Sequence, residues 1–163
     1  AALAEIDRDV PAILAGPMRQ PLWPDGVAAS LSHAGDVAVA VAAPLAHSGG
    51  VGIDIELARP TPELWDQVPL QRERRWLRAI DDTTERDRML ISLFSAKEAI
   101  YKAFFPRVGT YFGFDTAALE PTPYGFEANL VKSIDQAYPP ARAIRIHAEW
   151  FGDLVRTWLV LPR

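Results

Sequence analysis

Along the first third of the chain, large and small apolar residues alternate in the way that strand residues do. Residues 37–42 read Val-Ala-Val-Ala-Val-Ala, a period of two that indicates a strand with one bulky face and one small face. We expect this strand to follow a short one at 27–33 and to precede a third at 51–57. The proline-rich residues 9–26 and the segment 44–50 are expected to form loops.

The middle of the chain has the spacing of helices. We expect a short helix at 63–68, a charged amphipathic helix at 71–80, and a long helix at 84–105 with Pro106 as its stop. The apolar stripe of the long helix comprises Met89, Leu93, Ala96, Ile100, Ala103 and Phe104. Its polar residues off that stripe are Arg88, Ser92, Ser95, Glu98 and Lys102.

Strand patterns return in the last third of the chain. The segments 115–119, 124–130, 143–150 and 154–161 are each expected to be a strand. The last two are expected to form a hairpin across Phe151-Gly152-Asp153.

Composition narrows the class of protein. The 163 residues, 49% of them apolar, are expected to form one domain with a packed core. A net charge of −4 argues against binding to nucleic acid, and no apolar run approaches the roughly 20 residues of a membrane span. The absence of cysteine excludes disulfides and thiolate metal sites. With no visible signal peptide, we expect a cytoplasmic location, and we leave the oligomeric state open.

The strand at 51–57 carries two carboxylates on one face. Because side chains alternate along a strand, its apolar residues point into the core, and Gly52, Asp54 and Glu56 share the opposite face. The Cα atoms of the two acids should lie about 6–7 Å apart, so both carboxylates can reach one cation. We expect Gly52 to leave open space beside them. We also expect Asp54 and Glu98 to lie on an open polar face, so that replacing either with alanine should leave folding nearly intact. The alternative interpretation is a half-exposed strand with a solvated acidic face.

The long helix supplies a third carboxylate between two lysines. Glu98 and Lys102 are four residues apart and point the same way, and Lys97 is expected on a flank of the same face. Alone, this pattern is typical of a surface ion pair. Combined with the acidic strand, it suits Mg²⁺ and a phosphate ester, because Mg²⁺ prefers oxygen ligands and lysines neutralise the remaining phosphate charge.

A serine–histidine segment lies at the end of the first expected strand. Ser32 and His33 could begin a hydrolase triad, but the chain has no Gly-x-Ser-x-Gly elbow, so this signal is weak. His47 and His147 have no motif around them and remain unassigned.

Four motifs follow one another in the chain. They are Arg-x-Pro-x-Trp-Pro-x-Gly at 19–26, Ser-x-Ser-His at 30–33, Val-Gly-Ile-Asp-Ile-Glu at 51–56 and Phe-Ser-x-Lys-Glu-Ala-x-x-Lys at 94–102. In this order they resemble the surfactin-type 4′-phosphopantetheinyl transferases, and within them the enterobactin-synthase branch. The resemblance covers residues 16–120 well and the C-terminal strands only loosely.

The resemblance implies an α+β fold of two similar α/β halves related by a pseudo-twofold axis. The halves would cover about 1–48 and 49–163, with coenzyme A bound between them. The first half could be incomplete, or another chain could supply its missing segment. The family transfers the phosphopantetheine arm of coenzyme A to a serine of an acyl- or peptidyl-carrier protein. The resemblance does not indicate which carrier or pathway is served.

The matched motifs also imply roles for individual residues. Asp54, Glu56 and Glu98 would be the Mg²⁺ ligands, and Glu98 would also be the general base, directly or through a metal-bound water. The coenzyme A contacts would be Arg19, Ser32, His33, Lys97 and Lys102. Lys102, on the pyrophosphate, would also be catalytic, together with Glu98. Relatives carry a longer basic N-terminal segment, whereas only Arg8 and Arg19 precede the first strand here.

Three further expectations remain. The arginines of the 71–80 helix (Arg72, Arg74, Arg75 and Arg78) could form a docking patch for an acidic carrier, or a solvated face interspersed with Glu73. The chain could instead be another Mg²⁺-dependent phosphoryl-group enzyme, such as a phosphatase. It could also be a truncated, non-catalytic module that binds carrier proteins.

Overall fold

The fold contains one five-stranded and one two-stranded antiparallel sheet. In the computed structural model of the chain, the described residues are 2–6, 12–59, 62–136, 138 and 142–163. The large sheet has the order β3-β7-β6-β5-β4 and the small one joins β1 to β2. The strands are β1 (Val27–Ala34), β2 (Val37–Pro44), β3 (Gly50–Leu57), β4 (Ala117–Thr122), β5 (Gly125–Leu130), β6 (Ala143–Phe151) and β7 (Leu154–Leu161).

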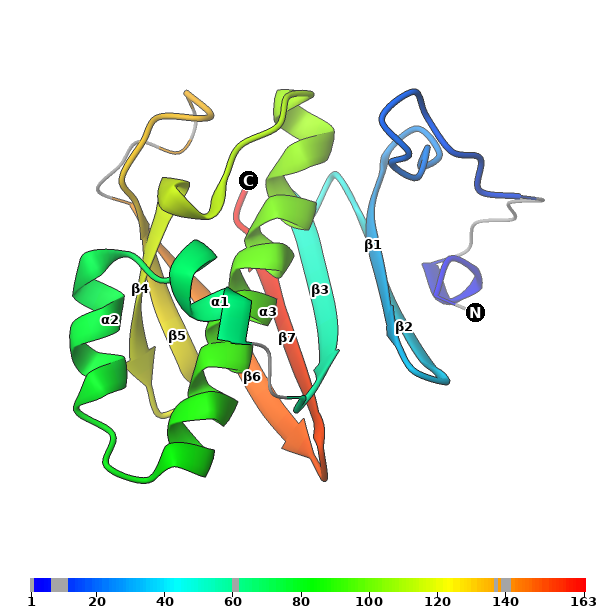
Figure 1. Cartoon of the computed structure of the whole chain (residues 1–163). Helices are drawn as coiled ribbons and strands as arrows, with labels where there is room; N and C mark the ends of the chain where they lie inside the picture. The colour runs from blue at the N-terminus through cyan, green and yellow to red at the C-terminus, as the bar shows by residue number, and fades with distance from the viewer. Residues whose placement is uncertain (1, 7–11, 60–61, 137, 139–141) are drawn as a thin grey trace.

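Helices cover one face of the large sheet. They are α1 (Pro62–Gln67), α2 (Gln71–Arg78) and the long α3 (Thr83–Val108), and short 3₁₀ turns occupy Ala4–Ile6 and Phe114–Thr116. Figure 1 shows α3 running along the sheet, α1 and α2 beside it, and the β1–β2 hairpin next to β3 on the other side. The α+β class and the expected order of elements are confirmed. No helix among the described residues is long and apolar enough to cross a membrane.

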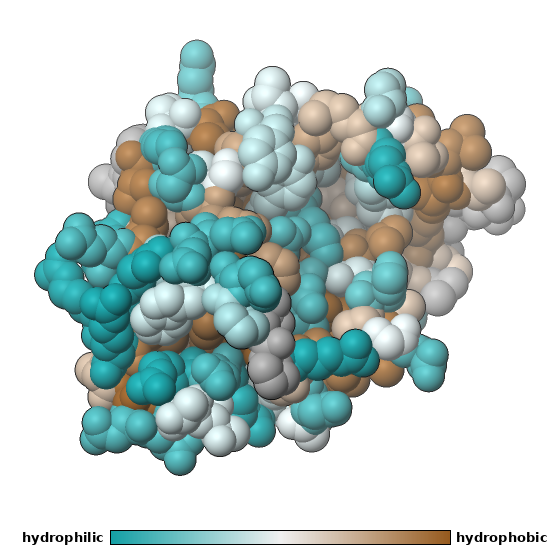
Figure 2. Space-filling model, viewed as in Figure 1, coloured by the Kyte–Doolittle hydropathy of each residue, from teal (hydrophilic) through white to brown (hydrophobic). Residues whose placement is uncertain are grey.

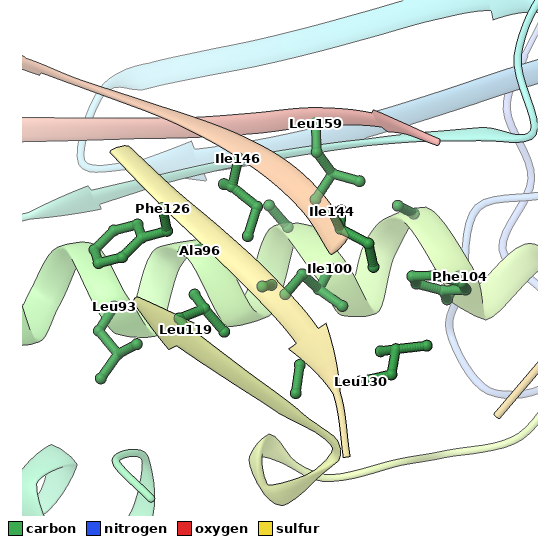
Figure 3. Close-up of a cluster of buried hydrophobic side chains, with 14 of the residues drawn as sticks. Leu93, Ala96, Ile100, Phe104, Leu119, Phe126, Leu130, Ile144, Ile146 and Leu159 are labelled. Carbon is green, nitrogen blue, oxygen red and sulfur yellow. The ribbon is translucent and has the colours of Figure 1, made fainter. Parts of the chain in front are cut away.

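The main hydrophobic core lies between α3 and the large sheet. Figure 3 shows Leu93, Ala96, Ile100 and Phe104 of α3 facing side chains from the sheet. The sheet contributes Leu119, Phe126, Leu130, Ile144, Ile146 and Leu159. The predicted apolar stripe of the helix is therefore the face that packs on the sheet.

Helix α3 differs from the prediction at its C-terminal end. Pro106 does not stop the helix, which continues to Val108 and ends at Gly109 with φ 65°. The N–H of Gly109 bonds back to the carbonyl of Phe105, so the last turn closes beyond the proline. At the other end, Asp82 caps the helix by accepting a hydrogen bond from the Glu85 N–H at 2.8 Å.

Two serines of α3 are also buried, although they lie off its apolar stripe. The Ser95 hydroxyl is 2.9 Å from the Thr157 hydroxyl on β7, and the Ser92 hydroxyl accepts from the Trp150 ring N–H. The sheet therefore contacts a wider arc of the helix than the stripe predicts, with small polar side chains paired across the contact.

Glycines in β3 set the distance between the strand and α3. A Cβ atom built on Gly52 would lie 1.9 Å from the carbonyl oxygen of Ala99, and one on Gly50 would lie 2.6 Å from that of Ala103. The expectation of open space beside Gly52 is therefore wrong, because the backbone of α3 fills it. Only glycine permits this approach of a helix backbone to a strand.

We predict that Gly52→Ala lowers the free energy of unfolding by about 3 kcal/mol or more, because its methyl group would overlap helix backbone that cannot rotate away. The matched control is Gly152→Ala, where a Cβ meets nothing but φ is 65°. It should cost only the left-handed penalty of about 1–2 kcal/mol. Urea unfolding of both variants tests this, and equal losses would contradict it.

Candidate active site between β1, β3 and α3

Three polar side chains from three elements meet where the hairpin adjoins the large sheet. The Lys102 Nζ of α3 donates to Asp54 Oδ1 of β3 at 2.6 Å and to Ser32 Oγ of β1 at 2.9 Å. Ser32 Oγ in turn donates to Asp54 Oδ1 at 2.8 Å. We call these three residues the Lys102 cluster. It joins residues that are far apart in the sequence and that belong to three of the four motifs.

The hairpin is held beside β3 through a serine rather than a backbone ladder. Ser30 Oγ accepts from the N–H of Ile53 at 3.1 Å and lies 3.5 Å from the Ile53 carbonyl oxygen. Two residues further along β1, Ser32 points to the same side and reaches Asp54. The Ser-x-Ser spacing thus attaches the strand at its first serine and delivers the second to the cluster.

Asp54 is buried, contrary to the open polar face that we expect for it. Its exposed fraction is 2%, and its Oδ2 atom has no hydrogen-bond partner among the described residues. A buried carboxylate oxygen without a partner is costly and calls for a ligand. The ion pair with Lys102 is made by Asp54 Oδ1, so it does not satisfy Oδ2.

Glu56 and Glu98 are partly buried near Asp54. The pKa of Glu56 is raised from 4.5 to about 7 by burial and then by the charge of Asp54, with Lys102 opposing and Glu98 adding to the rise. The pKa of Glu98 is raised by burial and then by Asp54, again opposed by Lys102. The three acids therefore repel one another across a shared region, with more negative charge than one lysine balances.

This donor set suits a divalent cation in its chemistry. Hard carboxylate oxygens are the ligands that Mg²⁺ prefers. Asp54 Oδ2 has no partner among the described residues, and burial followed by repulsion from Asp54 raises the pKa of Glu56 and of Glu98. Within the described residues, no three His, Cys, Asp or Glu side chains are grouped closely enough to hold a metal ion as they stand. The assignment of Asp54, Glu56 and Glu98 as metal ligands stays a prediction.

A pocket of about 260 Å³ lies against the Lys102 cluster. Arg19, Ser30 and Lys102 contribute to its lining, together with Trp23 and Phe105. Arg19 is exposed and has φ 63°, and its N–H bonds to the Gly16 carbonyl at 2.9 Å in a tight turn. The structure thus brings Arg19 and Lys102 to one cavity. Arg8 lies outside the described residues.

His33 does not join the Lys102 cluster. It follows Ser32 on β1, so alternation directs it to the opposite side of the strand, where it is exposed. A contact from His33 to coenzyme A stays a prediction that this placement does not favour.

Lys97 is buried, and its expected place on the open flank of Glu98 is wrong. It is 3% exposed, and its Nζ donates to Glu73 Oε2 at 2.7 Å and to the carbonyls of Val68 and Phe114, each at 3.0 Å. Burial lowers its pKa, and Glu73 partly offsets that effect. Its three N–H donors are used within the protein, which disfavours a direct contact with a phosphate.

Glu73 is the residue that sequence reasoning missed. The alternative of a solvated face interspersed with Glu73 is wrong for this residue, since it is 0% exposed and lies with Leu77 on the buried face of α2. Its neighbours Arg72, Arg75 and Arg78 are exposed. The spacing of Glu73 with the buried Leu77 gave the available signal, because residues four apart share a helix face.

A second, smaller pocket of about 120 Å³ opens beside Glu98. Its lining includes Tyr101, Tyr111, Phe112 and Phe114, and the segment 109–116 after α3 forms one wall. Tyr101 packs on Tyr111 and Phe112, with ring centroids 5.8 and 5.0 Å apart. The sequence offered no motif for this aromatic wall.

Comparison with known proteins agrees with the order of motifs. The sequence profile of the 4′-phosphopantetheinyl transferase superfamily matches residues 50–146, and that of the 4′-phosphopantetheinyl transferase N-terminal domain matches residues 1–43. The chain belongs to the 4′-phosphopantetheinyl transferase superfamily. The two matches divide close to the predicted boundary at about residue 48.

The alignments with individual relatives cover most of this chain but only about half of each relative. The chain is 39% identical over 117 residues to the 4′-phosphopantetheinyl transferase Npt of Nocardia iowensis, covering 71% of this chain and 51% of that protein. It is 42% identical over 122 residues to enterobactin synthase component D of Salmonella typhi, covering 72% and 48%. With the transferase PptT of Mycobacterium tuberculosis, identity is 37% over 107 residues, covering 64% and 46%. The chain thus spans about half the length of the curated relatives it matches.

We predict that Glu56→Gln stabilises the protein more at pH 8 than at pH 5, measured as the shift in Tm with EDTA present. The folded chain holds the Glu56 proton up to about pH 7, whereas the ordinary value is 4.5. Stability is therefore lost as the pH rises through that window, and glutamine removes the loss. Glu120→Gln, at an exposed site on β4, is the control. An equal shift in Tm at both pH values would contradict the raised pKa of Glu56.

We predict that Asp54→Ala lowers the free energy of unfolding by about 1–3 kcal/mol, because Lys102 and Ser32 lose their shared acceptor. The near-intact folding that an open face implies is not expected for a carboxylate that is 2% exposed. Glu149→Ala breaks the exposed pair with Arg156 and should cost under about 1 kcal/mol. Chemical denaturation compares the two variants. A denaturation midpoint for Asp54→Ala equal to that of the wild type would contradict the predicted loss of stability.

Proposed function

We propose that this protein transfers the 4′-phosphopantetheine arm of coenzyme A to a serine of an acyl- or peptidyl-carrier protein, with Mg²⁺, and releases 3′,5′-adenosine bisphosphate. The observation that carries the proposal is the Lys102 cluster beside Glu56 and Glu98, in a chain that belongs to this transferase superfamily. The names of the relatives in Nocardia iowensis and Mycobacterium tuberculosis support the same reaction.

Binding of coenzyme A would use the cationic side of the 260 Å³ pocket. Lys102 and Arg19 line this pocket and supply positive charge for the phosphates, and Trp23 and Phe105 supply apolar surface. Ser32 holds Lys102 in place through the 2.9 Å hydrogen bond. The aromatic pocket beside Glu98 suits the uncharged pantetheine arm.

In the reaction, the hydroxyl oxygen of the carrier serine forms a bond to the β-phosphorus of coenzyme A. The bond from that phosphorus to the bridging oxygen breaks, and its electron pair leaves with the adenosine bisphosphate. Glu98 accepts the serine proton in our proposal, and its raised pKa makes this carboxylate a better base than a solvated one. Lys102 stabilises the charge on the diphosphate oxygens.

Asp54, Glu56 and Glu98 would hold the Mg²⁺ ion. When bound, the ion supplies Lewis-acid stabilisation of the charged phosphate oxygens. The close contact between β3 and α3 fixes the positions of these three carboxylates relative to one another.

An acidic carrier protein would dock on the arginine surface of α2. Arg72, Arg75 and Arg78 are exposed, and Figure 2 shows hydrophilic surface over α1 and α2. Arg74 is committed within the protein, since it donates to the carbonyls of Pro69 and Asp66. Three of the four predicted arginines are therefore available to a partner of opposite charge.

The proposal is tested by incubating an apo carrier protein with coenzyme A, Mg²⁺ and this protein, and measuring the carrier mass. A gain equal to one phosphopantetheine arm is expected. No gain while the carrier still binds would favour the non-catalytic module, and hydrolysis of a phosphate ester with no gain would favour the phosphatase.

We predict that Glu98→Gln lowers the transfer rate by about 100-fold or more, because the amide cannot accept the proton. Lys102→Met should raise the KM for coenzyme A, because the pocket loses a cation. Steady-state kinetics by the same mass assay measure both. Near-normal rates for Glu98→Gln would rule out its role as base.

We predict that Arg75→Glu raises the KM for the carrier protein and leaves the KM for coenzyme A unchanged, because α2 carries the docking surface. The control is Arg145→Glu, an exposed site on β6 in the large sheet. Equal effects of the two variants would place the docking surface elsewhere.

A further inference from the structure

Several elements of the fold meet at one buried ion pair. Lys97 Nζ bonds to Glu73 Oε2 at 2.7 Å, and to the carbonyls of Val68 and Phe114 at 3.0 Å each. Glu73 also accepts backbone N–H groups from Leu70 at 2.6 Å and Leu119 at 2.8 Å. We call this group the Lys97 cluster. It joins α3 to the end of α1, the start of α2, the segment before β4, and β4 itself.

Both charges of the pair are withdrawn from water. The side chains of Lys97 and Glu73 are 2% and 0% exposed. Burial of such a pair is compensated only where the geometry is good and the remaining donors and acceptors are satisfied. Here each charged group also bonds to two backbone groups, so the two opposite charges balance each other and together hold four backbone groups in place, at Val68, Leu70, Phe114 and Leu119.

One of these stretches is the wall of the pocket beside Glu98. Phe114, whose carbonyl receives the Lys97 bond, lies in the segment 109–116 and lines that pocket. Its ring also packs edge-on against Phe94 of α3, with centroids 5.7 Å apart. A second ion pair at this end of the segment joins Asp115 to Lys132, but both of its side chains are 57% exposed, so solvent screens it.

We propose that Lys97 and Glu73 are positioning residues. They hold the segment 109–116 against α3, and through it they hold the aromatic wall of the pocket that opens beside Glu98. Neighbouring residues of one motif thus have different tasks. Both contribute to the lining of this pocket, but the Lys97 ammonium is committed to Glu73 and to the wall, whereas Glu98 is only partly buried. Only the role of that pocket in binding coenzyme A rests on the proposed function.

Hydrogen exchange tests the positioning role without any assay of activity. In Lys97→Met, the peptide that covers 109–117 should exchange about tenfold faster than in the wild type, because Phe114 loses its anchor. Peptides from β6 and β7 should keep their rates. A purely structural role would speed exchange in all peptides alike, and that result, or an unchanged 109–117 peptide, would overturn the proposal.

A second variant removes the risk that Lys97→Met leaves Glu73 charged and unpaired. The double variant Glu73→Gln/Lys97→Met carries no buried charge, and the amide oxygen of the new glutamine can still accept from the Leu119 N–H. It should show the same selective increase at 109–117. The matched control is Lys132→Met, which removes the exposed pair at the same segment and should leave exchange within about twofold of the wild type.

Calorimetric titration with coenzyme A then tests the effect of the wall on binding. The double variant should bind about tenfold more weakly than the wild type, whereas Lys132→Met should not differ. Equal affinity of the double variant and the wild type would overturn the link between the Lys97 cluster and the pocket. If the wild-type protein binds no coenzyme A, the proposed function fails, and the exchange rates alone decide the positioning role.

Discussion

The close approach of the α3 backbone to β3 is the constraint on which the rest of the site depends. Gly50 and Gly52 permit carbonyl groups of the helix to lie where any other residue would place a Cβ atom. With the helix at this distance, Asp54 and Glu56 of the strand face Glu98 and Lys102 of the helix across a narrow gap. The two glycines therefore act on the chemistry of the site through geometry alone.

The charge balance of the site follows from that contact. Burial, and after it repulsion from Asp54 and Glu98, raises the pKa of Glu56 to about 7, while the charge of Lys102 opposes the rise. Lys102 pairs with Asp54, but the second oxygen of Asp54 has no hydrogen-bond partner in the described part of the chain. A divalent cation would supply the missing charge, and Lys102 would then be free to act on a diphosphate. The carboxylates could therefore accommodate a divalent cation in addition to the ammonium group of Lys102.

Most elements of the fold could be predicted from the sequence, because their periods are local. The alternation at 37–42, the stripe of α3 and the C-terminal hairpin all have the expected form. The alternation along β3 also placed Asp54 and Glu56 on the face that meets Glu98. The end of α3 was missed because Pro106 lies inside the last turn, which continues to Val108 and is closed by the bond from the Gly109 N–H to the Phe105 carbonyl.

Burial of individual polar residues could not be predicted in the same way. The partners of Lys97 are a carboxylate on α2 and carbonyls of two loops, none of which a helix-spacing argument can identify. For Glu73, which stands among four arginines, the sequence offered one signal of burial, its spacing of four residues from Leu77. The burial of Asp54 depends on Ser32 and Lys102, which come from other elements. Spacing gives the face of an element, but the neighbouring elements decide whether that face meets water.

We infer that β3 and α3 together form one site for a divalent cation and a diphosphate. Calorimetric titration of Mn²⁺ in the presence of coenzyme A tests this inference, with Asp54→Asn and Glu98→Gln compared against Glu149→Gln at an exposed position of β6. We expect one ion per wild-type chain, binding weakened about tenfold or more in each of the first two variants, and no change in the third. Wild-type affinity in both Asp54→Asn and Glu98→Gln would contradict it.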